Sequence, residues 1–163
     1  MKEILKDILT ENSTRQIREE LVLRDTKLYV DLPKMQAVLG PRRVGKTSAM
    51  NLYMQELSRV KGVSSSQLIY FNFEDERVHF LPEQLDLILQ SWRELHPEVH
   101  LGDCYFFFDE VQAAAGWEKF LNRISETYTK KICFTGSNSR LLHTEVNTVL
   151  RGRSIALELL PLS

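Results

Sequence analysis

Several features that would place a sequence in a specialised class are scarce or missing here. The 163 residues contain two cysteines, Cys104 and Cys133, each inside an apolar run. We therefore expect buried, reduced thiols rather than a disulfide framework. No stretch reaches the roughly 18 consecutive apolar residues of a membrane-spanning helix, and the charged first residues do not form a signal peptide. These absences predict a cytoplasmic protein without a membrane segment.

A charge excess of either sign is also missing. The 21 Lys and Arg residues stand against 22 Asp and Glu, which gives a net charge of −1 at pH 7. This balance does not indicate nucleic-acid binding, which usually requires a basic surface. The chain is long enough, with 43% hydrophobic residues, to bury an ordinary core in one domain.

From residue 34 onward, short apolar runs alternate with longer amphipathic stretches. The runs, which we interpret as strands, cover 35–39, 67–73, 104–108, 131–135 and 154–160. The helical stretches cover about 45–60, 81–96, 116–128 and 138–149. This alternation indicates an α/β doubly wound fold, a parallel sheet with helices on both faces. Residues 1–33 are predicted to form a short N-terminal helical segment that ends at Pro33, before a core at 34–163.

A phosphate-binding motif lies between the first run and the first helical stretch. The pattern G-x-x-x-x-G-K-[ST] is matched by Gly40, Pro41, Arg42, Arg43, Val44, Gly45, Lys46 and Thr47. Its glycines let successive backbone N–H groups point at phosphate oxygens, and the helix start adds positive charge. Lys46 is expected to reach the β- and γ-phosphates, and the Thr47 hydroxyl to ligate Mg²⁺. With Ser48, residues 40–48 form the predicted nucleotide loop of a P-loop NTPase.

Two acidic residues follow the apolar run Tyr105–Phe108. Asp109 is expected at the carboxyl edge of the sheet, where ligands of such sheets bind, and there it can hold Mg²⁺. Glu110 lies one residue further, where it can deprotonate a water for attack on the γ-phosphate. The guanine-reading segment of GTPases is missing, so ATP is the expected nucleotide.

A further strand is predicted directly after the acidic one, at about 131–136. In P-loop proteins with Asp-Glu at this position, that strand inserts between the phosphate-loop strand and the acidic strand. The predicted fold is therefore a three-layer sandwich whose five parallel strands have the order 5-1-4-3-2. The apolar run before Asp109 is expected in the middle of this sheet.

The motifs resemble, in order, those of the predicted prokaryotic AAA+ superfamily ATPases, in which this core precedes an uncharacterised C-terminal domain. The segments that carry the resemblance are 40–47, 71–75, 108–112, 116–118, 134–139 and 150–153. The resemblance runs from about residue 20 to the end of the chain. It implies that the C-terminal region of that family is missing, so we expect a truncated core.

The resemblance also implies roles for residues beyond the two motifs. Residues 135–138 are similar to the sensor-1 segment, so Ser137 or Asn138 is expected to contact the γ-phosphate or the attacking water. Arg151 or Arg153 is expected to act in trans on the nucleotide of a neighbour, which requires a homo-oligomer. A helix N-cap and a solvated arginine remain the alternatives for these two pairs.

Together these features predict an ATPase that binds ATP with Mg²⁺. Lys46, Thr47, Asp109 and Glu110 are expected to carry the hydrolysis, with support from the sensor and the arginine. The alternative is a regulatory module that binds the nucleotide as an ordering ligand and hydrolyses it poorly. A nucleic-acid motor is supported only by local basic residues such as Lys130 and Lys131.

Overall fold

The computed structural model describes residues 1–16, 34–41, 45–137 and 152–158. The strands are β1 (Met35–Leu39), β2 (Leu68–Asn72), β3 (Tyr105–Asp109), β4 (Ile132–Gly136) and β5 (Ser154–Glu158). The α-helices are α1 (Lys2–Gln16), α2 (Lys46–Arg59), α3 (Leu87–Leu95) and α4 (Trp117–Thr127). The strands, α2 and α4 all match their predicted ranges within about two residues at each end. The predicted helix at 138–149 lies outside the described residues.

One predicted helix begins later than expected. The stretch 81–96 starts with the 3₁₀ turn η2 (Pro82–Gln84), and the α-helix proper begins only at Leu87. Pro82 occupies the first position of the turn, and the Gln84 side chain accepts a hydrogen bond from the backbone N–H of Leu81 at 2.9 Å. These local contacts close a separate turn, so the amphipathic pattern begins before the regular helix does.

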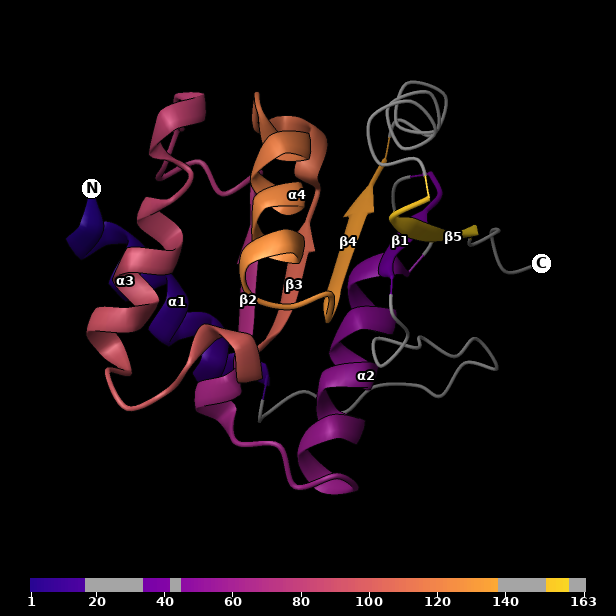
Figure 1. The fold of residues 1–163 in the computed structure, drawn as a ribbon, viewed down its shortest axis with the longest axis horizontal. Coiled ribbons are helices and arrows are strands. Elements are labelled where there is room, and N and C mark those ends of the chain that lie inside the picture. The colour runs from indigo at the N-terminus through magenta and orange to yellow at the C-terminus, as the bar shows by residue number, and fades with distance from the viewer. Residues whose placement is uncertain (17–33, 42–44, 138–151, 159–163) are drawn as a thin grey trace.

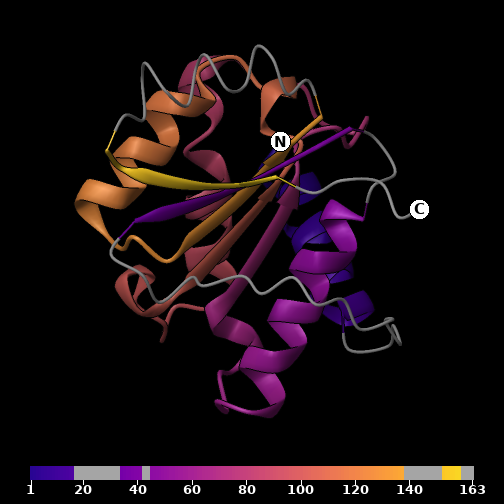
Figure 2. The same cartoon turned by 90° about the vertical axis from the view of Figure 1, so that its right-hand side faces the viewer.

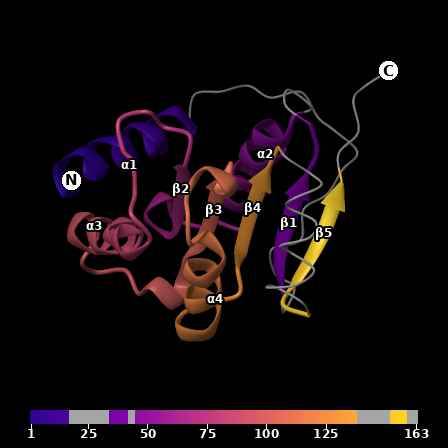
Figure 3. The same cartoon turned by 90° about the horizontal axis from the view of Figure 1, so that it is seen from above.

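The five strands form one parallel sheet in the order β2-β3-β4-β1-β5, visible from above in Figure 3. This is the predicted order 5-1-4-3-2 counted from the other edge. β3 is an interior strand as expected, but β4 occupies the centre. Because all strands are parallel, their carboxyl ends meet at one edge of the sheet.

Helices cover both faces of the sheet, as Figure 1 and, from the side, Figure 2 show. On one face Val38, Phe107 and Cys133 pack with the apolar side of α2. On the other face Phe108 and Phe134 pack in a larger cluster with α3 and α4. Successive residues of a strand point to opposite faces, and an uninterrupted apolar run therefore serves both layers.

The first helix covers the outer edge of β2, at the left of Figure 3. Leu5, Ile8 and Leu9 of α1 are buried in the larger core cluster, and the Asn12 side chain donates to the backbone oxygen of Tyr70 at 3.4 Å. An unpaired strand edge invites pairing with another chain, and a helix laid over it prevents this. α1 therefore shares the core of the sheet, while the division into 1–33 and 34–163 stays a prediction.

Exposed ion pairs add to the contacts between α1 and the rest of the fold. Arg77, in the loop after β2, donates to both carboxylate oxygens of Glu11, at 3.1 and 2.9 Å. Lys2 and Lys6 lie 3.3 and 3.1 Å from the Glu94 carboxylate on α3. Such exposed pairs are weak because water and salt screen them, so burial of the apolar side of α1 is the larger contribution.

The two cysteines are buried and unpaired with each other. Burial raises the pKa of the Cys104 thiol to about 12. Burial, and then the nearby charge of Asp109, raises the pKa of the Cys133 thiol further. Both thiols therefore stay protonated and unreactive near neutral pH. In the part of the chain that the structure describes, no helix is both long and apolar enough to cross a bilayer.

Candidate nucleotide and catalytic site

The candidate site lies where β1 leads into α2 at the carboxyl edge of the sheet. Gly45 is the N-cap of α2 and has φ 94° and ψ 23°. A residue with a side chain would be strained in this left-handed conformation. This turn lets the helix begin at Lys46, so that its first residues lie beside the strand ends. Gly40 is buried, Pro41 and Ser48 are exposed, and Arg42, Arg43 and Val44 lie outside the described residues.

The Lys46 ammonium is buried, with 4% of the residue exposed. Its Nζ donates to the backbone oxygens of Gly40 at 2.6 Å and Gly136 at 2.8 Å, and to the Ser137 hydroxyl at 3.0 Å. It also lies 3.7 Å from a carboxylate oxygen of Glu110. A buried charge is stable only when it is paired and hydrogen-bonded, and these groups satisfy that condition. Lys46 thus connects the phosphate loop with the ends of β3 and β4.

Asp109 ends β3 and is 1% exposed. One carboxylate oxygen, Oδ2, accepts from the Thr47 hydroxyl of α2 and the Tyr70 hydroxyl of β2, each at 2.6 Å. The other oxygen, Oδ1, accepts from the Thr135 hydroxyl of β4. Hydroxyl groups from three different elements therefore hold this carboxylate.

Glu110 follows directly and has φ 52° and ψ 53°, a left-handed conformation that is uncommon for residues other than glycine. The Ser137 hydroxyl contacts both of its carboxylate oxygens at 2.6 Å. The Gln112 side-chain amide donates to Oε2 at 2.7 Å. The backbone N–H of Glu110 donates to the Thr135 hydroxyl at 2.9 Å. The sharp turn after β3 thus directs Glu110 toward Ser137.

Three residues of this site were given no role of their own by sequence reasoning. Tyr70 and Thr135 hold Asp109, and Gln112 holds Glu110. A signal existed for Thr135, a hydroxyl residue at the carboxyl end of a strand that otherwise reads Ile-Cys-Phe. Tyr70 sits in an apolar strand, where its hydroxyl needs a buried partner. Identifying that partner requires the pairing of β2 with β3, which a single sequence does not give.

One other predicted residue, Arg153, lies outside this cluster. Arg153 pairs with Glu126 near the end of α4 at 3.0 Å, at the amino edge of the sheet and away from Lys46. Asn138 and Arg151 lie outside the described residues.

The donor atoms near Asp109 suit a magnesium ion. Mg²⁺ prefers oxygen ligands and is commonly held by one or two carboxylates together with waters and phosphates. The Thr47 hydroxyl and Asp109 Oδ2 lie 2.6 Å apart beside the phosphate loop. They offer one hydroxyl oxygen and one carboxylate oxygen as ligands. These two residues would hold the ion.

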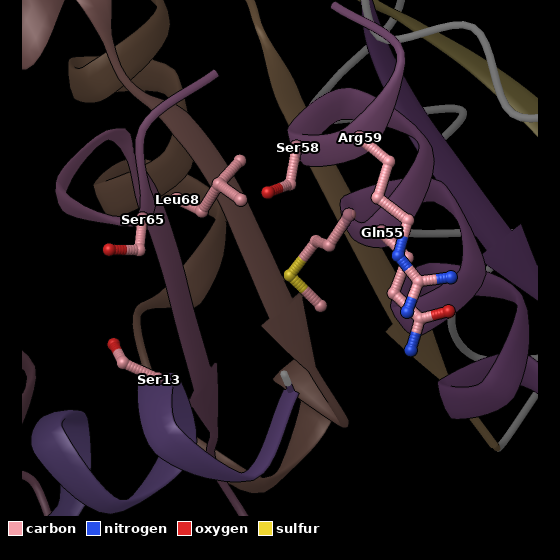
Figure 4. Close-up of a pocket in the computed structure, with 7 residues that line it drawn as sticks. Ser13, Gln55, Ser58, Arg59, Ser65 and Leu68 are labelled. Carbon is pink, nitrogen blue, oxygen red and sulfur yellow. The ribbon is translucent and has the colours of Figure 1, made fainter. Parts of the chain in front are cut away.

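A separate small pocket lies between α1, α2 and the start of β2, with a volume of about 110 Å³ (Figure 4). Leu68 and Met54 line it with several polar residues, and Ser58 points toward Leu68 while Arg59 points away. Met54 and Ser58 belong to the last part of α2, whereas Lys46 begins that helix. The pocket is therefore not part of the candidate site.

Comparisons with known proteins identify relatives of this chain. Residues 32–163 match the family model described as AAA domain. An uncharacterized protein of Haemophilus influenzae is 30% identical over 151 residues, covering 93% of this chain and 37% of the relative. An uncharacterized protein of Methanocaldococcus jannaschii is 29% identical over 163 residues, covering 99% and 34%. The chain thus spans about a third of the length of these curated relatives.

Among solved structures, C. elegans PCH-2 aligns with 96% of this chain and 41% of its own, with a TM-score of 0.48 and 16% identity. The family match covers most of the chain and includes the phosphate loop, β3 and β4. The chain therefore belongs to the AAA domain family, and this membership indicates a nucleotide-binding domain.

Proposed function

We propose that this domain binds ATP together with Mg²⁺ and hydrolyses it to ADP and phosphate. The observation that carries the proposal is the meeting of an amine and two acids at the phosphate loop. Lys46 Nζ lies 3.7 Å from the Glu110 carboxylate, and Thr47 lies 2.6 Å from Asp109. Phosphoryl transfer to water needs a cation, a carboxylate suited to a metal and a second carboxylate, and all three groups meet at this loop.

Lys46 and the loop bind the phosphates in this proposal. In the structure Lys46 donates to the backbone oxygens of Gly40 and Gly136. Phosphate oxygens carry more negative charge than these carbonyls, so they are stronger acceptors for the same ammonium. The N-terminus of α2 adds its partial positive charge, and the residues of the 40–48 loop other than Pro41 supply backbone N–H donors.

Thr47 and Asp109 hold Mg²⁺. When bound, the ion neutralises charge on the β- and γ-phosphate oxygens. Tyr70 and Thr135 keep the Asp109 carboxylate in place through their hydroxyl groups. A ligand that is already oriented loses little entropy when the metal binds.

Glu110 is the general base. It accepts a proton from a water whose oxygen attacks the γ-phosphorus, while the bond from that phosphorus to the β,γ-bridging oxygen breaks and leaves ADP. Ser137, or its neighbour Asn138, contacts the γ-phosphate or this water. The Ser137 hydroxyl contacts both Lys46 and Glu110, which supports a link between the phosphate side and the base.

Arg151 or Arg153 acts in trans within a homo-oligomer. Arg153 lies at the amino edge of the sheet, paired with the exposed Glu126 of α4, and is remote from the nucleotide loop of its own chain. An exposed ion pair is weak, so Arg153 can leave Glu126 when a neighbouring subunit offers a phosphate. In this reading, assembly is required for full activity.

A regulatory module with little hydrolysis is the second candidate. It is favoured by the mutual pairing of Lys46, Ser137 and Glu110, which must rearrange before the base can meet a water. A domain that remains in this arrangement would bind the nucleotide without turning it over.

The test is phosphate release from Mg-ATP at increasing protein concentration, with wild type beside Glu110→Gln. We expect specific activity that rises with concentration and falls on the order of 10²- to 10⁴-fold in the variant. Nucleotide binding should survive, and ATP at 100 times its dissociation constant should stabilise both proteins by about 2.7 kcal/mol. Stabilisation without phosphate release would favour the regulatory module. Absence of stabilisation by Mg-ATP would contradict both functions.

A further inference from the structure

Gln112 makes an unusual contact with Glu110. It lies in the 3₁₀ turn η4 (Val111–Ala113), two residues after Glu110, and its Nε2 donates to Glu110 Oε2 at 2.7 Å. The other half of its amide, Oε1, is buried and has no hydrogen-bond partner within the described part of the chain. The Gln112 amide therefore donates a hydrogen bond through Nε2 but accepts none through Oε1.

This arrangement does not serve stability. A buried acceptor without a partner lowers the stability of the fold, and an apolar side chain of similar size would avoid the loss. The left-handed backbone of Glu110 is a second local cost at the same turn. Two unfavourable features, two residues apart in one turn, both involve residues that position one carboxylate. Features of this kind are typical of functional sites.

The hydrogen bonds that Gln112 and Ser137 make to Glu110 depend on different groups. Ser137 accepts from Lys46 while it contacts Glu110, so a change in Lys46 affects it directly. Lys46 must turn toward phosphate when a nucleotide binds. Gln112 reaches Glu110 from within the same turn, and within the described part of the chain its side chain makes no hydrogen bond to Lys46. Its hydrogen bond can therefore persist when the nucleotide is bound.

We propose that Gln112 is a positioning residue that holds the Glu110 carboxylate in place for proton transfer once Lys46 has turned to the phosphates. The proposal rests on the function proposed above, with Glu110 as the general base. Gln112 acts through Glu110 and has no separate contact with the nucleotide.

The test replaces Gln112 by methionine, which has nearly the same shape and lacks both the amide donor and the orphan oxygen. We expect kcat to fall by about 10- to 100-fold, the usual effect of losing a hydrogen bond to a charged group. The dissociation constant for Mg-ATP and the unfolding midpoint should not worsen. A residue that only supports the fold would change stability as well.

Gln90 provides the matched control. Its Nε2 donates to the Asp86 carboxylate at 2.9 Å on α3, far from the phosphate loop along the chain. Gln90→Met removes the same kind of hydrogen bond, and kcat is expected to stay within about twofold of wild type.

A double-mutant cycle tests whether Gln112 acts through Glu110. In single-turnover measurements, Gln112→Met should lower the rate of wild type but not the residual rate of Glu110→Gln. An unchanged kcat in Gln112→Met, or an equal loss in both backgrounds, would overturn the positioning role while leaving the proposed ATPase intact. A wild type that binds Mg-ATP without turnover would overturn both, so the two failures are distinguishable.

Discussion

Asp109 and Glu110 are neighbours in the chain, but their surroundings differ. Asp109 is 1% exposed, continues a regular strand and accepts hydrogen bonds from Thr47, Tyr70 and Thr135. The Glu110 side chain is 13% exposed and follows a left-handed turn. One of its partners, Ser137, is shared with Lys46.

This difference separates a fixed group from an adjustable one. The hydroxyls around Asp109 come from α2, β2 and β4, so the position of the carboxylate is set by the packing of the sheet. The position of Glu110 depends on a turn and on a serine that also contacts Lys46. In the proposed function, the metal side of the site therefore forms with the fold and the base side responds to the nucleotide.

The largest expected effect comes from Asp109→Asn, which breaks the fixed side. In the proposed function Asp109 holds Mg²⁺, so this change removes a metal ligand. Because a metal contributes several kcal/mol to such a reaction, turnover should fall by about 100-fold or more. Phosphate release over a Mg²⁺ titration measures this. Normal turnover at ordinary Mg²⁺ concentrations would show that Asp109 does not hold the ion.

A smaller effect is expected when the stability of Thr135→Val is compared with that of Ser137→Ala. Thr135 is fully buried, donates to Asp109 and accepts from the Glu110 N–H, so its loss leaves a buried donor without a partner. We expect the unfolding free energy to fall by about 1–3 kcal/mol. Ser137→Ala, at a partly exposed position, should cost less than about 1 kcal/mol while still lowering turnover. Urea unfolding compares the two, and the reverse order of stability would contradict the distinction.

The smallest effect is expected for Tyr70→Phe. This change removes one of the two hydroxyls on Asp109 Oδ2 and leaves Thr47 in place. The loss of stability should be about 1 kcal/mol, with half-saturation by Mg²⁺ changed only a few-fold. Thermal unfolding and the Mg²⁺ dependence of phosphate release test this. A loss of turnover as large as that of Asp109→Asn would mean that the three hydroxyls do not hold the Asp109 carboxylate jointly.

Much of this fold could be predicted from the sequence. The apolar runs 35–39, 67–73, 104–108 and 131–135 each match a strand to within one residue at either end, because strands buried on both faces have few polar residues. The phosphate-loop motif located Lys46 and Thr47 at the start of α2, since its spacing is tied to that turn. The strand order followed from the class of motif and is confirmed.

The contacts inside the site could not be predicted in the same way. Lys46 and Ser137 are 91 residues apart in the chain, and they meet only because β4 pairs with β1. The Tyr70 hydroxyl finds Asp109 because β2 pairs with β3. No pattern of neighbouring residues in the sequence predicts these contacts between distant residues. The position of Arg153 relative to a neighbour is likewise a property of an assembly and remains a prediction.

The helix that covers the edge of β2 has a consequence for the synthesis of the chain. α1 leaves the ribosome before the sheet does, and its partners Tyr70, Arg77 and Glu94 follow its own residues by 58, 66 and 92 positions. Until they are made, the apolar side of α1 has no core to enter, and once β2 forms, its open edge depends on the return of α1. A shortened chain that begins at the phosphate-loop strand would keep every residue of the nucleotide site and lose the cover of this edge. Its yield as a monomer, rather than its affinity for ATP, would reveal the loss.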